Sequence, residues 1–293
     1  MAEPQTHAWR SPDLGPARAI ELPQGRLRYH ERGEGRVLLF AHGWLANANL
    51  WRKVVPRLAD RFRCLVPDLP LGAHLQPMRE DLDGTPDGIA RVVNDFLDAL
   101  RVEEVALIGN DSGGAYSQVA TAARPERVPH LILNACETPY DSFPPAAFQG
   151  LQDAAKTPGT LAGLLEPLRD RTFRRAPAAF GHLIKHPIDD AASDSYALPL
   201  LELPGVCRDA SKVLSSASQT YVAAAGRKLI ATFAGAVTFI WPTEDVFFSL
   251  ENVRRYAGEL PKARVELVAD SYAFTPEDQP ERLAELIADA MAG

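Results

Sequence analysis

The chain has 293 residues, of which 46% are hydrophobic and 24% charged, a composition typical of a globular protein able to bury its own core. A formal net charge of −7, without a lysine- and arginine-rich block, excludes nucleic acid as an expected partner. No apolar run is long enough to span a membrane, and residues 1–14 lack the apolar core of a signal peptide. The three cysteines have no metal-ligand spacing and indicate free thiols in a reducing compartment, so we expect a cytoplasmic protein without a metal or cofactor. No feature predicts an oligomeric state.

The first half of the chain alternates between strand and helix patterns. Residues 1–16 are polar and proline-rich, and we expect a loose arm there. Residues 17–22 and 26–30 alternate apolar and polar side chains around a turn, which predicts an antiparallel hairpin at a sheet edge. Two apolar runs, at 37–41 and 64–66, are typical of strands buried on both faces. Helical spacing predicts helices at 50–62, where Pro56 can introduce a kink, and at 88–100.

A third buried strand, at 105–108, leads into Gly109-Asn110-Asp111-Ser112-Gly113 and then into an alanine-rich helical segment. Strand, sharp turn and helix are the context of a nucleophile elbow, whose flanking positions need glycine because a Cβ would meet the neighbouring backbone. Only one register puts glycine at both flanks, and it places Asp111 at the apex. Ser112 as the nucleophile, or a turn without chemistry, are the alternatives. A chymotrypsin-like site is excluded, because it needs a β-barrel.

The second half departs from this rhythm and then returns to it. A strand is expected at 130–135, after which residues 141–228 show helical patterns broken by prolines. We interpret 141–228 as a helical cap inserted between two parts of an α/β core, residues 17–140 and 229–293. The later core part contains the expected strands 237–241 and 265–268 and the expected helices 252–260 and 280–291. The predicted fold is α/β, a mostly parallel eight-stranded sheet with helices on both faces and a helical cap.

Three motifs together resemble the α/β-hydrolase superfamily: His42-Gly43-Trp44, the elbow, and the segment from Trp241 to Asp245. An Asp at the elbow resembles the haloalkane dehalogenase and epoxide hydrolase branch. The resemblance implies that Asp111 attacks a carbon electrophile and forms an alkyl-enzyme ester. It also implies that the backbone N–H groups of Trp44 and Ser112 form an oxyanion hole, and that Asp245 orients a catalytic histidine.

Five further residues are candidates for the pocket or its surroundings: His42, Glu137, Tyr140, Ala273 and Phe274. In such motifs His42 is more often part of the scaffold than a direct participant. Glu137 is a weaker candidate for the catalytic acid, because some dehalogenases use that region. Epoxide hydrolases usually raise two tyrosines from the cap. Tyr140, Tyr196 and Tyr221 lie in or beside this cap, where tyrosines are more often packing residues.

The histidine that the resemblance requires is missing. It is expected shortly before Pro280, where this chain has Ala273 followed by Phe274, and none of the seven histidines follows residue 186. An ionised carboxylate needs no base for the first displacement, whereas hydrolysis of the ester needs a base to deprotonate water. The sequence therefore predicts a hydrolase of a small apolar electrophile of epoxide, ester or haloalkane type, with an impaired or atypical second step. Candidates for a replacement base are His42, His74, His182, His186 and Glu277.

Other interpretations stay open. Haloalkane dehalogenases usually carry a tryptophan directly after the nucleophile, where this chain has Ser112, so we rank halide release below the other electrophiles. The missing histidine also fits an inactive ligand-binding protein. A lyase or cyclase that uses Asp111 as an acid or base is a third hypothesis.

Overall fold

The strands form one sheet in the order β1-β2-β4-β3-β5-β6-β7-β8. The computed structural model describes residues 6–292. Its strands are β1 (Ala17–Leu22), β2 (Gly25–Arg32), β3 (Arg36–Ala41), β4 (Phe62–Pro67), β5 (Ala106–Asn110), β6 (His130–Asn134), β7 (Ala236–Pro242) and β8 (Ala263–Val268). β2 pairs antiparallel with β1 and with β4, and the remaining neighbours pair in parallel. The predicted eight-stranded, mostly parallel sheet is confirmed.

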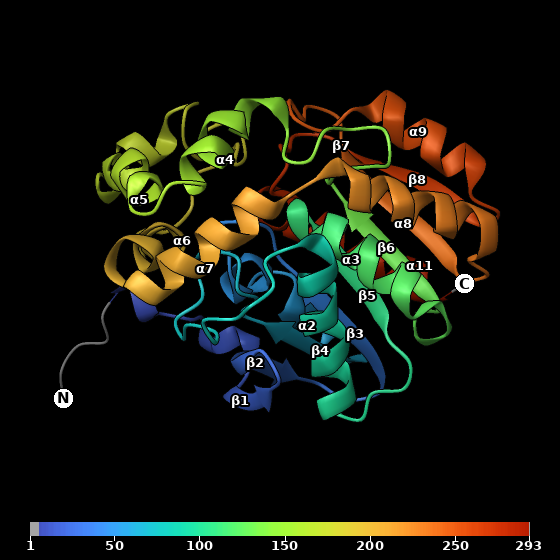
Figure 1. Cartoon of the computed structure of the whole chain (residues 1–293). Coiled ribbons are helices and arrows are strands. Elements are labelled where there is room, and N and C mark those ends of the chain that lie inside the picture. The colour runs from blue at the N-terminus through green and yellow to red at the C-terminus, as the bar shows by residue number, and fades with distance from the viewer. Residues whose placement is uncertain (1–5, 293) are drawn as a thin grey trace.

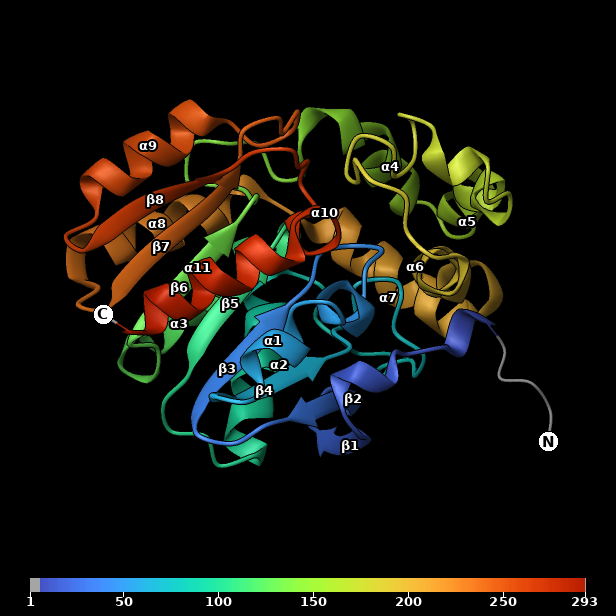
Figure 2. The same cartoon turned by 180° about the vertical axis from the view of Figure 1, so that it is seen from behind.

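Helices cover both faces of the sheet. The face towards the viewer in Figure 1 carries α2 (Pro86–Ala99), α3 (Ser112–Ala123) and α8 (Gln219–Thr232). The opposite face, seen in Figure 2, carries α1 (Val55–Leu58) and α11 (Pro280–Ala292). α9 (Leu250–Glu259) packs on β7 and β8, and α10 (Thr275–Asp278) precedes α11. Among residues 6–292, no helix is long and apolar enough to cross a membrane.

The chain between β6 and β7 is helical wherever it is regular. It contains η5 (Ala146–Phe148), α4 (Gln149–Ala155), α5 (Thr160–Leu165), η6 (Glu166–Arg169), η7 (Phe173–Arg175), α6 (Asp190–Glu202), α7 (Pro204–Ser216) and α8. Helices α4 to α7 gather at one end of the sheet (Figure 1), whereas α8 packs along α3. The division of the chain at residues 140 and 228 stays a prediction. The packing of α8 favours a cap that ends nearer to residue 218.

The predicted helix at 50–62 is divided in two. A short 3-10 helix, η3 (Ala48–Trp51), is followed by α1, in which Pro56 occupies the first turn. Proline has no N–H, and its ring clashes with the carbonyl four residues earlier, so a helix that begins before residue 52 does not continue through residue 56.

The prediction of a loose N-terminal arm is wrong for residues 6–14, and residues 1–5 lie outside the described part. This segment forms η1 (Thr6–Ala8) and η2 (Pro12–Leu14). The Arg10 guanidinium binds the buried carboxylate of Asp68 at 3.1 Å and the carbonyl of Ala73 at 2.9 Å. η1 packs on α6 of the cap, and Leu14 is buried in the core. The segment therefore joins the core and the cap.

The Arg10–Asp68 pair yields a test of this anchoring. Burial alone raises the pKa of Asp68, but Arg10 and the Ala48 N–H outweigh it and hold the pKa below its ordinary value. Arg10→Gln leaves a buried carboxylate without its cation, so we expect the free energy of unfolding to fall by about 3–5 kcal/mol in urea titrations. Arg18→Gln is the matched control, because Arg18 pairs with Glu31 at the surface and should cost about 0–1 kcal/mol. Equal losses in both variants would contradict the anchoring.

Candidate active site

Asp111 occupies the sharp turn between β5 and α3. Its backbone has φ 55° and ψ −143°, while Ser112 is already the first residue of α3. An added Cβ at Gly109 would collide with the backbone of Gly113 and Gly114, and one at Gly113 would collide with the carbonyls of Ala41 and His42. The two flanking glycines are therefore required by close packing, and the residue at the apex is Asp111 rather than Ser112.

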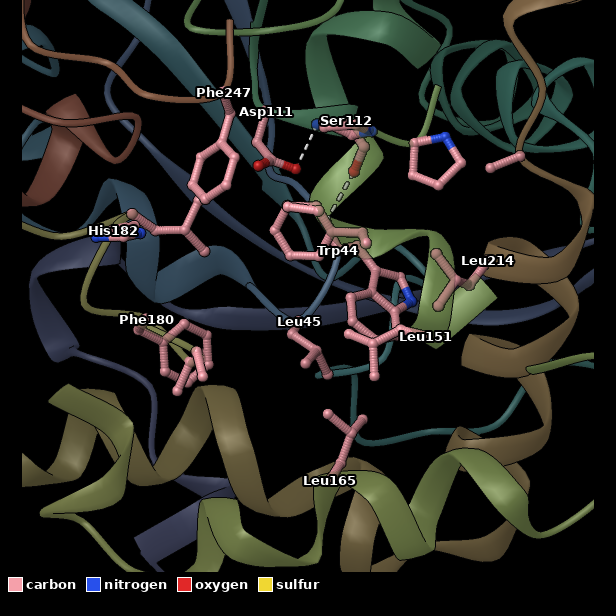
Figure 3. A pocket seen from close by; sticks show the side chains of 18 of the residues that line it. Trp44, Leu45, Asp111, Ser112, Leu151, Leu165, Phe180, His182, Leu214 and Phe247 are labelled. Carbon is pink, nitrogen blue, oxygen red and sulfur yellow. Dashed lines mark hydrogen bonds between the residues drawn. The ribbon is translucent and has the colours of Figure 1, made fainter. Parts of the chain in front are cut away.

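Ser112 connects the Asp111 carboxylate to the segment that contains Trp44. The Ser112 N–H donates to Asp111 Oδ1, and the Trp44 N–H donates to Ser112 Oγ at 2.9 Å (Figure 3). An added Cβ at Gly43 would collide with the Asp111 carboxylate, so this glycine makes room for it. The sequence analysis treated the Ser112 side chain only as an alternative nucleophile and expected the N–H groups of Trp44 and Ser112 to form an oxyanion hole. The Ser112 hydroxyl accepts the Trp44 N–H, and it also helps to lower the pKa of Asp111.

The elbow opens into an apolar cavity of about 360 Å³ between the core and the cap (Figure 3). Trp44, Leu45, Asp111 and Ser112 line it from the core. Aromatic and aliphatic side chains from the cap region complete the lining, among them Phe143, Phe148, Leu151, Leu165, Phe180 and Leu214. A cavity of this volume and lining suits a small, largely apolar molecule.

A second carboxyl group, Glu137, faces the same cavity. Its residue is 1% exposed, and Oε2 has no hydrogen-bond partner among residues 6–292. Burial raises the pKa of Asp111 to about 6, against hydrogen bonds from Ser112 and Trp44 that lower it. Burial, together with the charge of Asp111, raises the pKa of Glu137 well above its usual value. The two groups therefore titrate as a pair, in which Glu137 is the one that holds a proton more readily.

Asp245 follows β7, and one oxygen of its carboxylate accepts hydrogen bonds from the nearby backbone. Its Oδ1 accepts the N–H groups of Phe247 at 2.6 Å and Phe248 at 2.9 Å. Oδ2 has no partner, and no histidine hydrogen bonds with Asp245 in the described part of the chain. Burial raises the pKa of Asp245 to about 6, and the charge of Asp111 contributes to that shift, so the two carboxylates are within electrostatic reach.

Of the five pocket candidates, the structure brings Glu137 to the cavity and places the other four outside the lining that the described residues form. His42 is buried below the elbow, where Nε2 accepts the Leu69 N–H at 2.9 Å, and burial lowers its pKa to about 4. The Tyr140 hydroxyl bonds Glu259 on α9. Ala273 and Phe274 are fully buried.

Ala273 nevertheless lies close to the elbow, because the Asn110 side chain donates to its carbonyl at 2.7 Å. Among the candidate replacement bases, only His182 lines the cavity, beside the Phe247 ring at 6.4 Å between ring centroids. The others are engaged elsewhere: His74 with Asp209, His186 with Asp270, and Glu277 with Arg52. Sequence reasoning missed Tyr116, which lies one helical turn after Ser112, so its spacing on α3 could have revealed it.

Comparison with known proteins defines the family. The profile of the alpha/beta hydrolase fold matches residues 36–280. Haloalkane dehalogenase 2 from Mycobacterium tuberculosis is 27% identical over 285 residues, which cover 94% of this chain and 96% of the relative. The solved haloalkane dehalogenase DbeA from Bradyrhizobium elkani has a TM-score of 0.75 at 20% identity and covers 94% of this chain and 99% of its own. An epoxide hydrolase, CorEH, has a TM-score of 0.77 at 19% identity and covers 94% and 98%.

The chain belongs to the α/β hydrolase fold family, because the family profile matches most of its length. The two structural likenesses show the shared fold. The family profile and the similarity to haloalkane dehalogenase 2 support a hydrolase.

The raised pKa of Glu137 predicts a pH-dependent cost to stability. A carboxyl group whose folded pKa is raised binds more protons when folded, so stability falls as pH rises from about 4 towards the folded pKa. Glu137→Gln removes this proton linkage. We expect its melting temperature to exceed that of the wild type by a few degrees at pH 8, with a much smaller difference at pH 4. Glu104→Gln, on the surface, is the control. The same gain at both pH values would contradict a charge effect.

Proposed function

We propose that this chain hydrolyses a small apolar electrophile through Asp111 as a carboxylate nucleophile, with a slow second step. The observation that carries the proposal is the place of Asp111, at the apex of the elbow and at the wall of an apolar cavity, with the Ser112 N–H on its Oδ1. The relatives named as haloalkane dehalogenase and epoxide hydrolase support an electrophilic carbon as the reacting atom.

In the first step, the Asp111 carboxylate attacks the carbon of an epoxide or haloalkane and forms an alkyl ester. This step needs no base, because a pKa of about 6 leaves the carboxylate mostly ionised at pH 7.5. The Ser112 N–H fixes the orientation of the carboxylate before attack. The same N–H, with the Ser112 hydroxyl, stabilises the oxyanion when the ester is later hydrolysed.

In the second step, water must be deprotonated as it attacks the ester carbonyl. The acid position, Asp245, has no histidine bonded to it within residues 6–292, and the expected histidine position holds Ala273. General base catalysis typically contributes about 10²–10⁴-fold, so a chain without a positioned histidine should hydrolyse its ester slowly rather than not at all. We therefore propose that the chain binds a small-molecule substrate and forms a long-lived ester with it at Asp111.

This mechanism predicts a covalent adduct. We expect incubation with styrene oxide or phenethyl bromide to add one equivalent of the probe to the protein in intact-mass spectra. Peptide digestion should map the adduct to Asp111, and Asp111→Ala should abolish it, because the substitution removes the attacking oxygen. A rapid multiple turnover of either probe that persists in Asp111→Ala would sink the nucleophile assignment.

The vacant histidine position predicts a gain of function. We expect Ala273→His to shorten the lifetime of the Asp111 adduct by roughly 10–10³-fold, because a base next to the elbow can then activate water. Ala273→Gln is the matched control, since it adds comparable volume to the buried site but no base. Thermal melts of both variants establish that each is folded. Equal release of the adduct by the two variants would contradict a role for residue 273.

A further inference from the structure

We propose that Glu137 is the proton carrier of this reaction and that the substrate class it selects is an epoxide. The inference rests on the proposed function, because it takes Asp111 as the nucleophile. Glu137 would donate a proton to the departing ring oxygen in the first step. As a carboxylate it would then take a proton from water in the second, slowly, because its Oε2 has no partner among residues 6–292 that orients it.

Topology places Glu137 beside the nucleophile. β5 and β6 are parallel neighbours whose last residues, Asn110 and Asn134, are paired. Asp111 follows the first strand directly, and Glu137 lies three residues beyond the second, so both leave the same edge of the sheet. The Gln118 side chain on α3 donates to the Glu137 backbone carbonyl at 2.7 Å and fixes this segment. The carboxyl group is left facing the cavity, with Oε2 unpartnered in the described structure.

The surroundings of Glu137 favour its neutral form. The groups that influence it are Asp111 at the elbow, Asp141 at the start of the cap and Asp245 after β7. Tyr116 on α3 and the neighbouring Cys136 are themselves affected by Glu137, and burial raises the pKa of both. All of these groups are acidic, and His182 is the one basic side chain that residues 6–292 contribute to the lining of the same cavity. A buried carboxyl group among carboxylates keeps its proton to higher pH than an exposed one, so it can serve as a general acid.

The first step then balances for an epoxide. An oxygen of ionised Asp111 forms a bond to a ring carbon, the ring C–O bond breaks, and its electron pair stays on oxygen. That oxygen takes the proton of Glu137 and becomes a hydroxyl group. The product is a hydroxyalkyl ester on Asp111 and a Glu137 carboxylate. The negative charge of Asp111 has moved to Glu137.

The second step restores both groups. The Glu137 carboxylate takes a proton from water as the water oxygen attacks the ester carbonyl of Asp111. The resulting oxyanion lies at the Ser112 N–H, and its collapse breaks the bond to the alkyl oxygen. The departing alkoxide takes the proton of the regenerated Asp111 carboxylic acid and leaves as a diol. Asp111 is again ionised, Glu137 is again neutral, and one epoxide and one water have been consumed.

A haloalkane does not complete this cycle. Its halide departs with the electron pair as a stable anion and takes no proton, so Glu137 stays neutral and cannot deprotonate water. A halide also needs N–H donors, and the indole N–H of Trp44 in the cavity wall is directed to the carbonyl of Ala210 at 3.4 Å. The proton of Glu137 is therefore useful for an epoxide, whose leaving oxygen must be protonated, and not for a haloalkane.

The test compares two probes of similar size, styrene oxide and phenethyl bromide, in the full-length chain. The rate of adduct formation at Asp111 is followed by intact-mass spectrometry in wild type, Glu137→Gln and the surface control Glu104→Gln. We expect Glu137→Gln to slow the reaction of styrene oxide by roughly 10²-fold and that of phenethyl bromide by less than about threefold. In the wild type, the epoxide rate should rise through pH 6 and fall at higher pH as Glu137 ionises. The bromide rate should rise and then stay level.

The outcomes separate the two proposals. An adduct from neither probe would contradict the proposed function. Adducts from both, with equal effects of Glu137→Gln on the two probes, would overturn the role of Glu137 and leave Asp111 as the nucleophile. If His182→Ala slows the epoxide reaction and Glu137→Gln does not, the proton carrier is His182 and the inference fails. The bromide rate also reports that Glu137→Gln is folded.

Discussion

The turn at Asp111 constrains most of the site. Its left-handed φ lets the chain leave the central strand β5 and enter α3 within one residue, which requires glycine on both sides and at Gly43 across the gap. The same geometry places the Asp111 side chain at the open end of the sheet and aims the first N–H of α3 at its carboxylate. Nucleophile orientation, oxyanion stabilisation and access to the cavity are therefore consequences of one backbone conformation.

The electrostatics of the cavity follow from what surrounds that turn. Glu137 is buried and Asp111 and Asp245 are half-buried, and loss of hydration is the largest cause of the raised pKa in each case. Fold stability alone does not favour three carboxyl groups in one apolar region, because each must be protonated or left poorly solvated. Such clusters are typical of catalytic sites, where a group held neutral can donate a proton and a neighbouring ionised group can attack.

The sequence predicted the fold well, because its signals are local. Apolar runs of four to six residues and the glycine spacing of the elbow are set by neighbouring residues.

Prediction from the sequence failed where the outcome depends on residues that are distant in the chain. The N-terminal segment is polar and proline-rich, yet Asp68 and Asn49 hold it in place. Tyr140, Ala273 and Phe274 were assigned to the pocket by their position in the chain, which does not specify the direction of a side chain. For Glu137, the position after β6 can be read from the chain, but its burial and its proximity to Asp111 arise only from packing.

The N-terminal segment has a consequence for how a substrate reaches the cavity. Arg10 fastens it to the core at Asp68, while His7 pairs with Glu202 on α6 at 2.7 Å and η1 packs along that helix. The N-terminal segment therefore links α6 to the core. A rigid-body movement of the whole cap would have to break the contacts of Arg10 or His7. Among residues 6–292, α4 and α5 form no ion pair with the core, and they contribute Leu151, Leu164 and Leu165 to the cavity wall. We therefore expect the cavity to open by a displacement of α4 and α5, while α6 stays in place.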